Sequence, residues 1–98
     1  MTRVELLPGV LDDLKWIVDH LQRHEVEQAQ ARGAEVVSAI QVLADNPLIG
    51  GPVDNDRREL VIGRGAHGYV ALYQYAALVD TVFVLAIRAQ REGGYARP

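Results

Sequence analysis

Arginine, histidine and tyrosine side chains gather in the last third of the chain, where they could act together on an anionic partner. Arg88, Arg91 and Tyr95 follow the last apolar run, while Arg64 and His67 lie in a glycine-rich segment between two earlier runs. An arginine guanidinium binds phosphate or carboxylate through two hydrogen bonds, and a histidine or tyrosine can transfer a proton or position a nucleophile. The pattern is therefore compatible with phosphodiester cleavage and equally with binding to an anionic surface.

A structural role for the same residues is the competing interpretation. Arg88 and Arg91 could form ion pairs with Glu92 or Asp80, and Tyr95 could cover the core. Residue types and spacing alone favour this structural role over a functional one.

Charge is distributed unevenly along the chain. Residues 1–56 carry four basic and ten acidic side chains, a net charge of −6, whereas residues 57–98 carry six basic and three acidic side chains, a net charge of +3. A basic half is expected of a protein that binds nucleic acid or an acidic protein segment, but ordinary solvated arginines give the same balance.

Three other motifs predict no site. Residues 63–68 match the phosphate-binding pattern G-x-G-x-x-G, but β-type runs flank them on both sides, so a hairpin is expected in place of a strand-to-helix turn. His20 and His24 have the spacing of a metal-ligating pair without a third ligand, and Ser38 lacks the sequence context of a hydrolase nucleophile. We therefore expect no metal and no cofactor.

Length and composition predict one small domain, residues 1–98. The chain has no cysteine, and its N-terminus lacks the apolar core of a signal peptide. The longest uninterrupted apolar run, 82–87, is far shorter than the roughly 20 residues that cross a bilayer as a helix. We expect a soluble, cytoplasmic protein with no membrane partner.

Two apolar stripes with helical spacing predict two helices. The first contains Leu11, Leu14, Val18 and Leu21, with Ile17 beside it. The second contains Val26, Ala29, Gly33, Val36 or Val37, Ile40 and Leu43. The phase changes between the stripes, which places a turn near residues 22–25, and Asn46-Pro47 ends the second helix.

The remaining apolar runs predict a small sheet. A short strand is expected at 4–7 and three more near 58–62, 69–75 and 81–88, with a loop at 48–56. The connections between the last three are short enough for antiparallel hairpins. The predicted fold class is α+β, with two helices packed on one face of a small antiparallel sheet in the order β-α-α-β-β-β.

Both faces of the last predicted strand are apolar. Strict alternation places Thr81, Phe83, Leu85 and Ile87 on one face and Val82, Val84 and Ala86 on the other. Two helices can cover only one face of the sheet, so the other face is expected to bind a partner protein or a second copy of the chain. Alternatively, the tail and neighbouring side chains cover that face.

The sequence resembles the RelE/ParE superfamily, the toxins of bacterial type II toxin-antitoxin systems. The most specific matching pieces are Gly68-Tyr69 leading into Leu72-Tyr73, and Ile87-Arg88 leading into Arg91-Glu92. The resemblance runs from Leu11 through Asn46-Pro47 to Tyr95. It implies the same two-helix and sheet fold and a cognate antitoxin that neutralises the toxin in a heterotetramer or larger complex. It also implies that Val82, Val84 and Ala86 contact that antitoxin.

Two departures make the chain more similar to ParE, whose members poison DNA gyrase, than to RelE, whose members cut messenger RNA in the ribosome. RelE-type enzymes have an arginine directly after the position of Tyr69, where this chain has Val70, and the only lysine is Lys15 in the first helix. Many relatives also have a histidine where this chain has Ala89. Without that arginine and the strand lysines, the clamp that would stabilise charge during RNA cleavage is missing.

The resemblance thus implies a non-enzymatic gyrase inhibitor whose target-binding residues are Arg64, Arg88, Arg91 and Tyr95. The first alternative is a ribosome-dependent ribonuclease with Arg88, Arg91, Tyr95 and His67 as catalytic groups. The second is a degenerate, non-toxic relative that retains only antitoxin binding.

Overall fold

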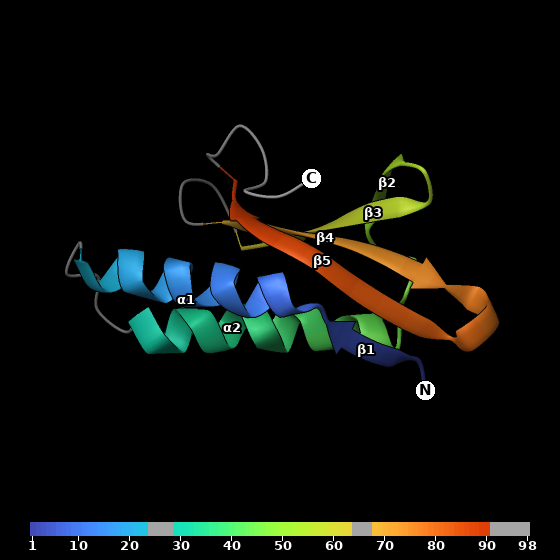
Figure 1. Ribbon diagram of the computed structural model, residues 1–98, viewed down its shortest axis with the longest axis horizontal. Helices are drawn as coiled ribbons and strands as arrows, with labels where there is room; N and C mark the ends of the chain where they lie inside the picture. Colours follow the sequence, from blue (N-terminus) through green and yellow to red (C-terminus); the bar gives the residue numbers. More distant parts are fainter. Residues whose placement is uncertain (24–28, 64–67, 91–98) are drawn as a thin grey trace.

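The computed structural model describes residues 1–23, 29–63 and 68–90 and contains two helices packed against a mixed sheet (Figure 1). In chain order the elements are β1 (Arg3–Leu6), α1 (Pro8–Arg23), α2 (Ala29–Gln41), the 3-10 turn η1 (Val42–Ala44), β2 (Gly51–Asp54), β3 (Arg57–Ile62), β4 (Tyr69–Ala76), the 3-10 turn η3 (Ala77–Val79) and β5 (Thr81–Ala89). The predicted fold class is confirmed.

The sheet has the strand order β1-β5-β4-β3-β2, so the first and last strands of the chain are neighbours. Antiparallel pairs join β2 to β3, β3 to β4 and β4 to β5. In contrast, β1 runs parallel to β5, with Val4 opposite Val82 and Leu6 opposite Val84. The sheet is therefore mixed and not wholly antiparallel as predicted. After β1 the chain continues in the same direction through α1, and α2 brings it back (Figure 1).

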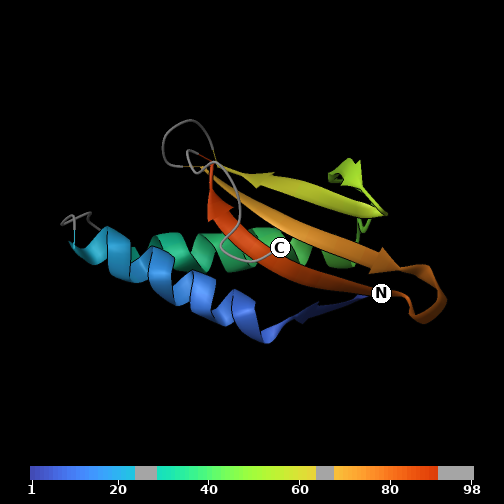
Figure 2. The same cartoon turned by 45° about the horizontal axis from the view of Figure 1, so that its top comes forward.

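The helices form a single layer on one side of the sheet (Figures 1 and 2). Their core contacts are made by Val10 and Ile17 of α1, Val36 and Ile40 of α2, and Leu43 of η1. The strands meet them with Ile62, Tyr69, Ala71, Tyr73, Val82, Val84 and Ile87. We call this side of the sheet the helix face and the other side the outer face.

The first apolar stripe was predicted to begin at Leu11, but the buried face of the helix begins one residue earlier, at Val10. Val10 is fully buried, whereas Leu11 is 60% exposed. The helix begins at Pro8, earlier than predicted, because proline is well suited to the first turn of a helix, where its missing N–H costs nothing. The second stripe is confirmed at Gly33, Val36, Ile40 and Leu43, while Val26 lies outside the described residues.

The predicted loop at 48–56 contains a short strand that the sequence did not indicate. Gly51 pairs with Glu59 and Pro52 with Arg58, so β2 forms the edge of the sheet beyond β3. Asn55 and Asp56 turn the chain between the two strands with positive φ angles of 35° and 67°. Glycine and proline depress strand propensity, and an edge strand tolerates them because half of its backbone groups face solvent.

The alternation predicted for the last strand was wrong beyond Val84. Leu72 pairs with Ala86 and Tyr73 with Val84, so Leu85 is an extra residue in a β-bulge. Val82 and Val84 are fully buried on the helix face, in the core, and not on the open face where antitoxin binding was predicted. Ala86 lies beyond the bulge and is absent from the core cluster, and its contact with an antitoxin stays a prediction.

Candidate target-binding site

Among the predicted target-binding and catalytic residues, Arg88 falls within the described part of the chain. Arg64, His67, Arg91 and Tyr95 lie outside the described residues, so their positions stay predictions. Arg88 stands near the end of β5, opposite Val70 of β4.

The outer face of the sheet presents Arg88 next to an acidic residue of β3. A nitrogen of the Arg88 guanidinium lies 3.8 Å from a Glu59 carboxylate oxygen, across the intervening strand β4. Leu60 and Ile62, which alternate with Glu59, pack on the helix face, so the Glu59 and Arg88 side chains occupy the outer one. The pair is only partly screened by water, because the Arg88 side chain is 18% exposed and that of Glu59 26%.

The same guanidinium also holds the backbone beyond β5. Its Nη1 donates to the carbonyl oxygens of Ala89 at 3.2 Å and Gln90 at 3.4 Å. Such bonds fix the rotamer of a long side chain and reduce the entropy that binding would otherwise cost. Arg88 is therefore preorganised on the outer face.

Asp80 is not the ion-pair partner of Arg88, which corrects one of the structural alternatives. Asp80 lies at the opposite end of β5, where its Oδ1 accepts hydrogen bonds from the hydroxyls of Thr2 and Tyr75, both at 2.7 Å. The hydrogen bond from Thr2, followed by that from Tyr75, lowers the pKa of Asp80 below its ordinary value. The other alternative partner, Glu92, lies outside the described residues.

The connection between β3 and β4 adjoins the end of β5, as the predicted site requires. The Gln90 N–H donates to the Gly68 carbonyl oxygen at 2.9 Å. A Cβ added to Gly68 would lie 2.1 Å from Nε2 of Gln90, so the glycine leaves room for that side chain. Gly68 and Gln90, the described residues next in sequence to 64–67 and 91–98, are thus in contact.

Tyr69 lies at this end of the sheet, opposite Ala89, on the helix face. Burial raises the pKa of its phenol, and the positive charge of Arg32 in α2 partly offsets that effect. The hydroxyl therefore stays protonated at neutral pH and is a hydrogen-bonding group, not a base. The sequence indicated Tyr69 only as part of the Gly68-Tyr69 pair.

The centre of the outer face is covered, contrary to the expectation of an open apolar face. Val70, Leu72 and Ala86 are only 5%, 4% and 2% exposed, although none of the three belongs to the core between sheet and helices that contains Val82 and Val84. Val61 of β3, which pairs with Val70, is 63% exposed beside this centre. Further large apolar side chains are exposed around β2 and in η3, namely Leu48, Ile49, Val53, Leu78 and Val79. A bare central patch is thus absent from the outer face of the described chain.

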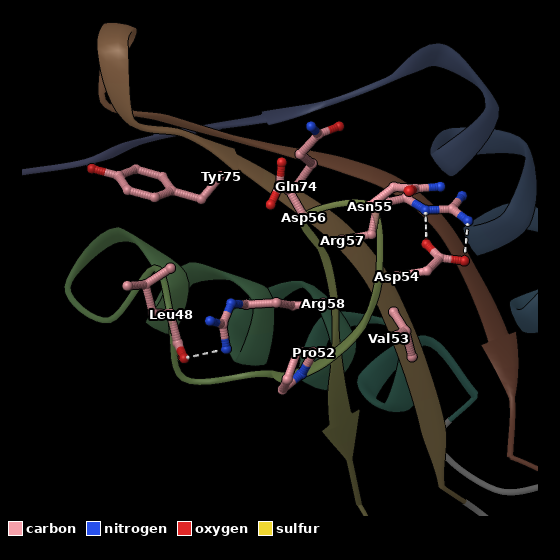
Figure 3. Close-up of a pocket in the computed structure, with 10 residues that line it drawn as sticks. All are labelled: Leu48, Pro52, Val53, Asp54, Asn55, Asp56, Arg57, Arg58, Gln74 and Tyr75. Atoms are coloured by element: carbon pink, nitrogen blue, oxygen red, sulfur yellow. Dashed lines mark hydrogen bonds and ion pairs between the residues drawn. The ribbon is translucent and has the colours of Figure 1, made fainter.

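A polar depression of about 450 Å³ lies at the β2–β3 turn (Figure 3). Arg88 is not among the residues that line it. Its two arginines are already engaged: Arg57 forms a two-point ion pair with Asp54, at 2.7 and 2.9 Å, and Arg58 donates to the carbonyl oxygens of Leu48 and Gly50. With Asp56 nearby, the formal charges of the lining residues cancel. The depression therefore offers no basic site for a phosphate.

Metal and membrane sites receive no support from the described residues. No group of three or more histidine and carboxylate side chains among them could hold a metal ion. His20 stacks on Trp16 with ring centroids 4.9 Å apart, and His24 lies outside the described part. Within the part of the chain that the structure describes, neither helix has the length and apolar character needed to cross a bilayer.

The fold is shared with a solved toxin-antitoxin structure. The RelBE2 toxin-antitoxin complex from Mycobacterium tuberculosis matches with a TM-score of 0.61 and 21% sequence identity, over 91% of this chain and 98% of that chain. At that identity the likeness establishes the common fold. It therefore defines the structural class of the chain, two helices packed on one face of a mixed sheet.

The sequence itself identifies the family. Residues 4–93 match the family described as "ParE toxin of type II toxin-antitoxin system, parDE". Because that match spans nearly the whole chain, the protein belongs to the ParE toxin family, within the RelE/ParE superfamily that the sequence resembles. No curated protein matches the sequence.

Proposed function

We propose that this protein is a toxin that inhibits DNA gyrase by trapping its DNA-cleaved state and is held inactive by a cognate antitoxin. Membership of the ParE family supports the toxin role. The choice of gyrase over messenger RNA rests on the chemistry of the outer face of the sheet.

Among the described residues, the outer face lacks the cluster of positive charge that RNA cleavage would need, and this observation carries the proposal. β4, in the middle of the sheet, has the sequence YVALYQYA without a basic residue, and Val70 occupies the position at which RelE-type enzymes have arginine. Lys15 lies on α1, exposed beside the groove between the helices. The guanidinium of Arg88 forms an ion pair with Glu59, whose negative charge partly offsets the positive charge of Arg88. Arg88 would therefore stabilise the negative charge of a cleavage transition state less well.

Arg88 is instead suited to docking against a protein surface. A preorganised, partly buried arginine is a frequent centre of protein interfaces. In the proposal it acts with Arg64, Arg91 and Tyr95, and the hydrogen bond between Gln90 and Gly68, which are next in sequence to 91–98 and 64–67, supports this grouping. Its target is a protein surface of gyrase, not the RNA backbone.

Purified protein in a gyrase supercoiling assay tests the proposal. The wild-type protein should inhibit supercoiling and accumulate cleaved DNA, and Arg88→Ala should raise the half-inhibitory concentration about tenfold or more. Arg57→Ala is the matched control, since Arg57 is also an arginine of the sheet but lies at the far end, paired with Asp54. Folded wild-type protein that leaves gyrase unaffected would exclude the proposal.

The ribonuclease alternative leaves a different trace. Primer extension on translated messages after induction would reveal cuts positioned by codon, with Arg88, Arg91, Tyr95 and His67 as candidate catalytic groups.

Absence of both gyrase inhibition and messenger RNA cleavage, in cells that grow normally without an antitoxin, would favour the second alternative, a degenerate relative that retains only antitoxin binding.

We further propose that the antitoxin assembles with this toxin in a heterotetramer or larger complex. The RelBE2 structure contains such a toxin bound to its antitoxin, and this chain shares that fold. Co-expression with the neighbouring reading frame, followed by light scattering of the purified complex, would give the stoichiometry. A toxin that elutes alone and remains inhibitory would contradict this part.

A further inference from the structure

We infer that Asp13 is a positioning residue for Arg88, through a hydrogen bond that holds the bulged strand β5. The inference rests on the proposed function only in giving Arg88 a target. The orientation of the Arg88 side chain toward the outer face does not depend on that function.

The bulge decides which face Arg88 occupies. In a regular strand, side chains two residues apart share a face, so Arg88 would follow Val82 and Val84 into the core. The extra residue Leu85 shifts the alternation, which sends Ile87 into the core and Arg88 to the outer face beside Glu59. Bulges commonly redirect side chains next to functional sites.

Asp13 holds the backbone immediately after the bulge. Its Oδ2 accepts a hydrogen bond of 3.0 Å from the N–H of Ile87, the residue before Arg88. β1 pairs with β5 only as far as Val84, whose carbonyl oxygen accepts from the Leu7 N–H at 3.1 Å. Beyond Val84, α1 lies along this edge of β5 in place of a strand, and Asp13 supplies the acceptor that a neighbouring strand would have given.

A carboxylate in this position has no packing advantage. Asp13 is 9% exposed and lies on the buried side of α1 with Val10 and Ile17. Burying a charged group costs free energy that a leucine at the same place would avoid, so its hydrogen bond to the bulged backbone gives it a role. That role fixes the phase of the strand at the residue that precedes Arg88.

Two substitutions separate positioning from simple packing. Asp13→Asn keeps an acceptor oxygen at the same place, whereas Asp13→Leu removes the acceptor while preserving bulk. We expect Asp13→Leu to raise the half-inhibitory concentration for gyrase to that of Arg88→Ala, about tenfold or more, and Asp13→Asn to stay within about twofold of the wild type. The double variant Asp13→Leu/Arg88→Ala should be no weaker than Arg88→Ala alone, because both changes disable one group.

Nuclear magnetic resonance provides a reading that does not depend on the target. Nuclear Overhauser effects between the Arg88 and Glu59 side chains should be present in the wild type and in Asp13→Asn and absent in Asp13→Leu. Spectra with native dispersion throughout show that each variant is folded. If Asp13→Leu does not fold, the comparison of wild type with Asp13→Ala, which removes the acceptor with less steric change, takes its place.

Each result bears on the inference. Persistence of the Arg88–Glu59 Overhauser effects in folded Asp13→Leu overturns it, as does additivity of the two substitutions in the gyrase assay. Their disappearance in Asp13→Leu and persistence in Asp13→Asn support it even if the wild-type protein fails to inhibit gyrase, in which case only the proposed function falls.

Discussion

The amide N–H of Gly50 donates a buried hydrogen bond of 2.8 Å to the hydroxyl of Tyr73, and this contact anchors the loop that leads into β2. Tyr73 is fully buried in the centre of β4. Arg58 strengthens the anchor from β3 by donating to the Gly50 carbonyl oxygen at 2.7 Å. The loop is therefore attached to the middle of the sheet, which explains why a glycine stands at its base.

Replacement of Gly50 by alanine should destabilise the protein. The added Cβ would lie 2.7 Å from the Tyr73 ring, from its hydroxyl and from the Glu59 carbonyl oxygen, none of which can move freely. Overpacking of this kind costs about 1–3 kcal/mol. Gly51→Ala is the matched control, since a Cβ there meets nothing within 4 Å. Urea unfolding should show a lower midpoint for Gly50→Ala alone, and equal midpoints for both variants would refute the steric argument.

The hydrogen bond itself is tested by Tyr73→Phe. Removal of the hydroxyl leaves the Gly50 N–H buried without its acceptor, which should lower the free energy of unfolding by about 1–3 kcal/mol. Tyr75→Phe removes an exposed hydroxyl that donates to Asp80 and should have a smaller effect. Hydrogen exchange of the Gly50 amide supplies the local reading: protection unchanged in Tyr73→Phe would mean that another acceptor replaces the hydroxyl.

The elements that the sequence predicted well are those with uniform periodicity. The helical stripe from Gly33 to Leu43 and the strands at 58–62, 69–75 and 81–88 were placed within one or two residues of β3, β4 and β5, because long amphipathic or apolar runs dominate local preferences. β2 was missed because its glycine and proline obscure its strand character, and its existence depends on pairing with β3.

The site was less accessible to sequence analysis, and the bulge is the reason. No local signal in the run TVFVLAIRA distinguishes Leu85 from its neighbours, yet this residue reverses the orientation of all that follow. Strict alternation therefore predicts Val84 and Ile87 on opposite faces of the sheet, whereas both lie on the helix face. Asp13 also escaped notice, because its partner is a backbone amide 74 positions away.

The crossing of α1 and α2 predicts compensation between Gly33 and Val18. A Cβ added to Gly33 would lie 2.8 Å from Cγ2 of Val18, so Gly33→Ala introduces a steric clash. We expect the clash to cost more free energy than the roughly 1 kcal/mol that alanine gains over glycine in helix propensity. Val18→Ala should make room for the new methyl group. Denaturant unfolding should therefore give a double variant that is more stable than the sum of the single changes predicts, and strict additivity would show that the helices do not touch there.

The hydrogen bonds to Asp80 predict a specific loss of stability in acid. Thr2 and Tyr75 donate to its carboxylate, and the Thr2 bond is the larger cause of its lowered pKa. A carboxyl whose pKa is lower in the folded than in the unfolded state stabilises the fold above its unfolded pKa of roughly 4, and this contribution disappears as the pH falls through the folded value. Stability should thus decline on acidification partly through this group.

Asp80→Asn isolates that contribution, because asparagine tolerates the left-handed backbone at this position, φ 45°, and cannot ionise in this range. The difference in unfolding free energy between wild type and Asp80→Asn should be greatest near neutral pH and shrink below about pH 4, since all other carboxyl groups titrate in both proteins and cancel. In a Thr2→Val background, the difference in unfolding free energy at neutral pH between the proteins without and with Asp80→Asn should be smaller, because the hydrogen bond that lowers the Asp80 pKa most is absent. Parallel stability curves for wild type and Asp80→Asn across the acid range would show that Asp80 has the same pKa in the folded and unfolded chains.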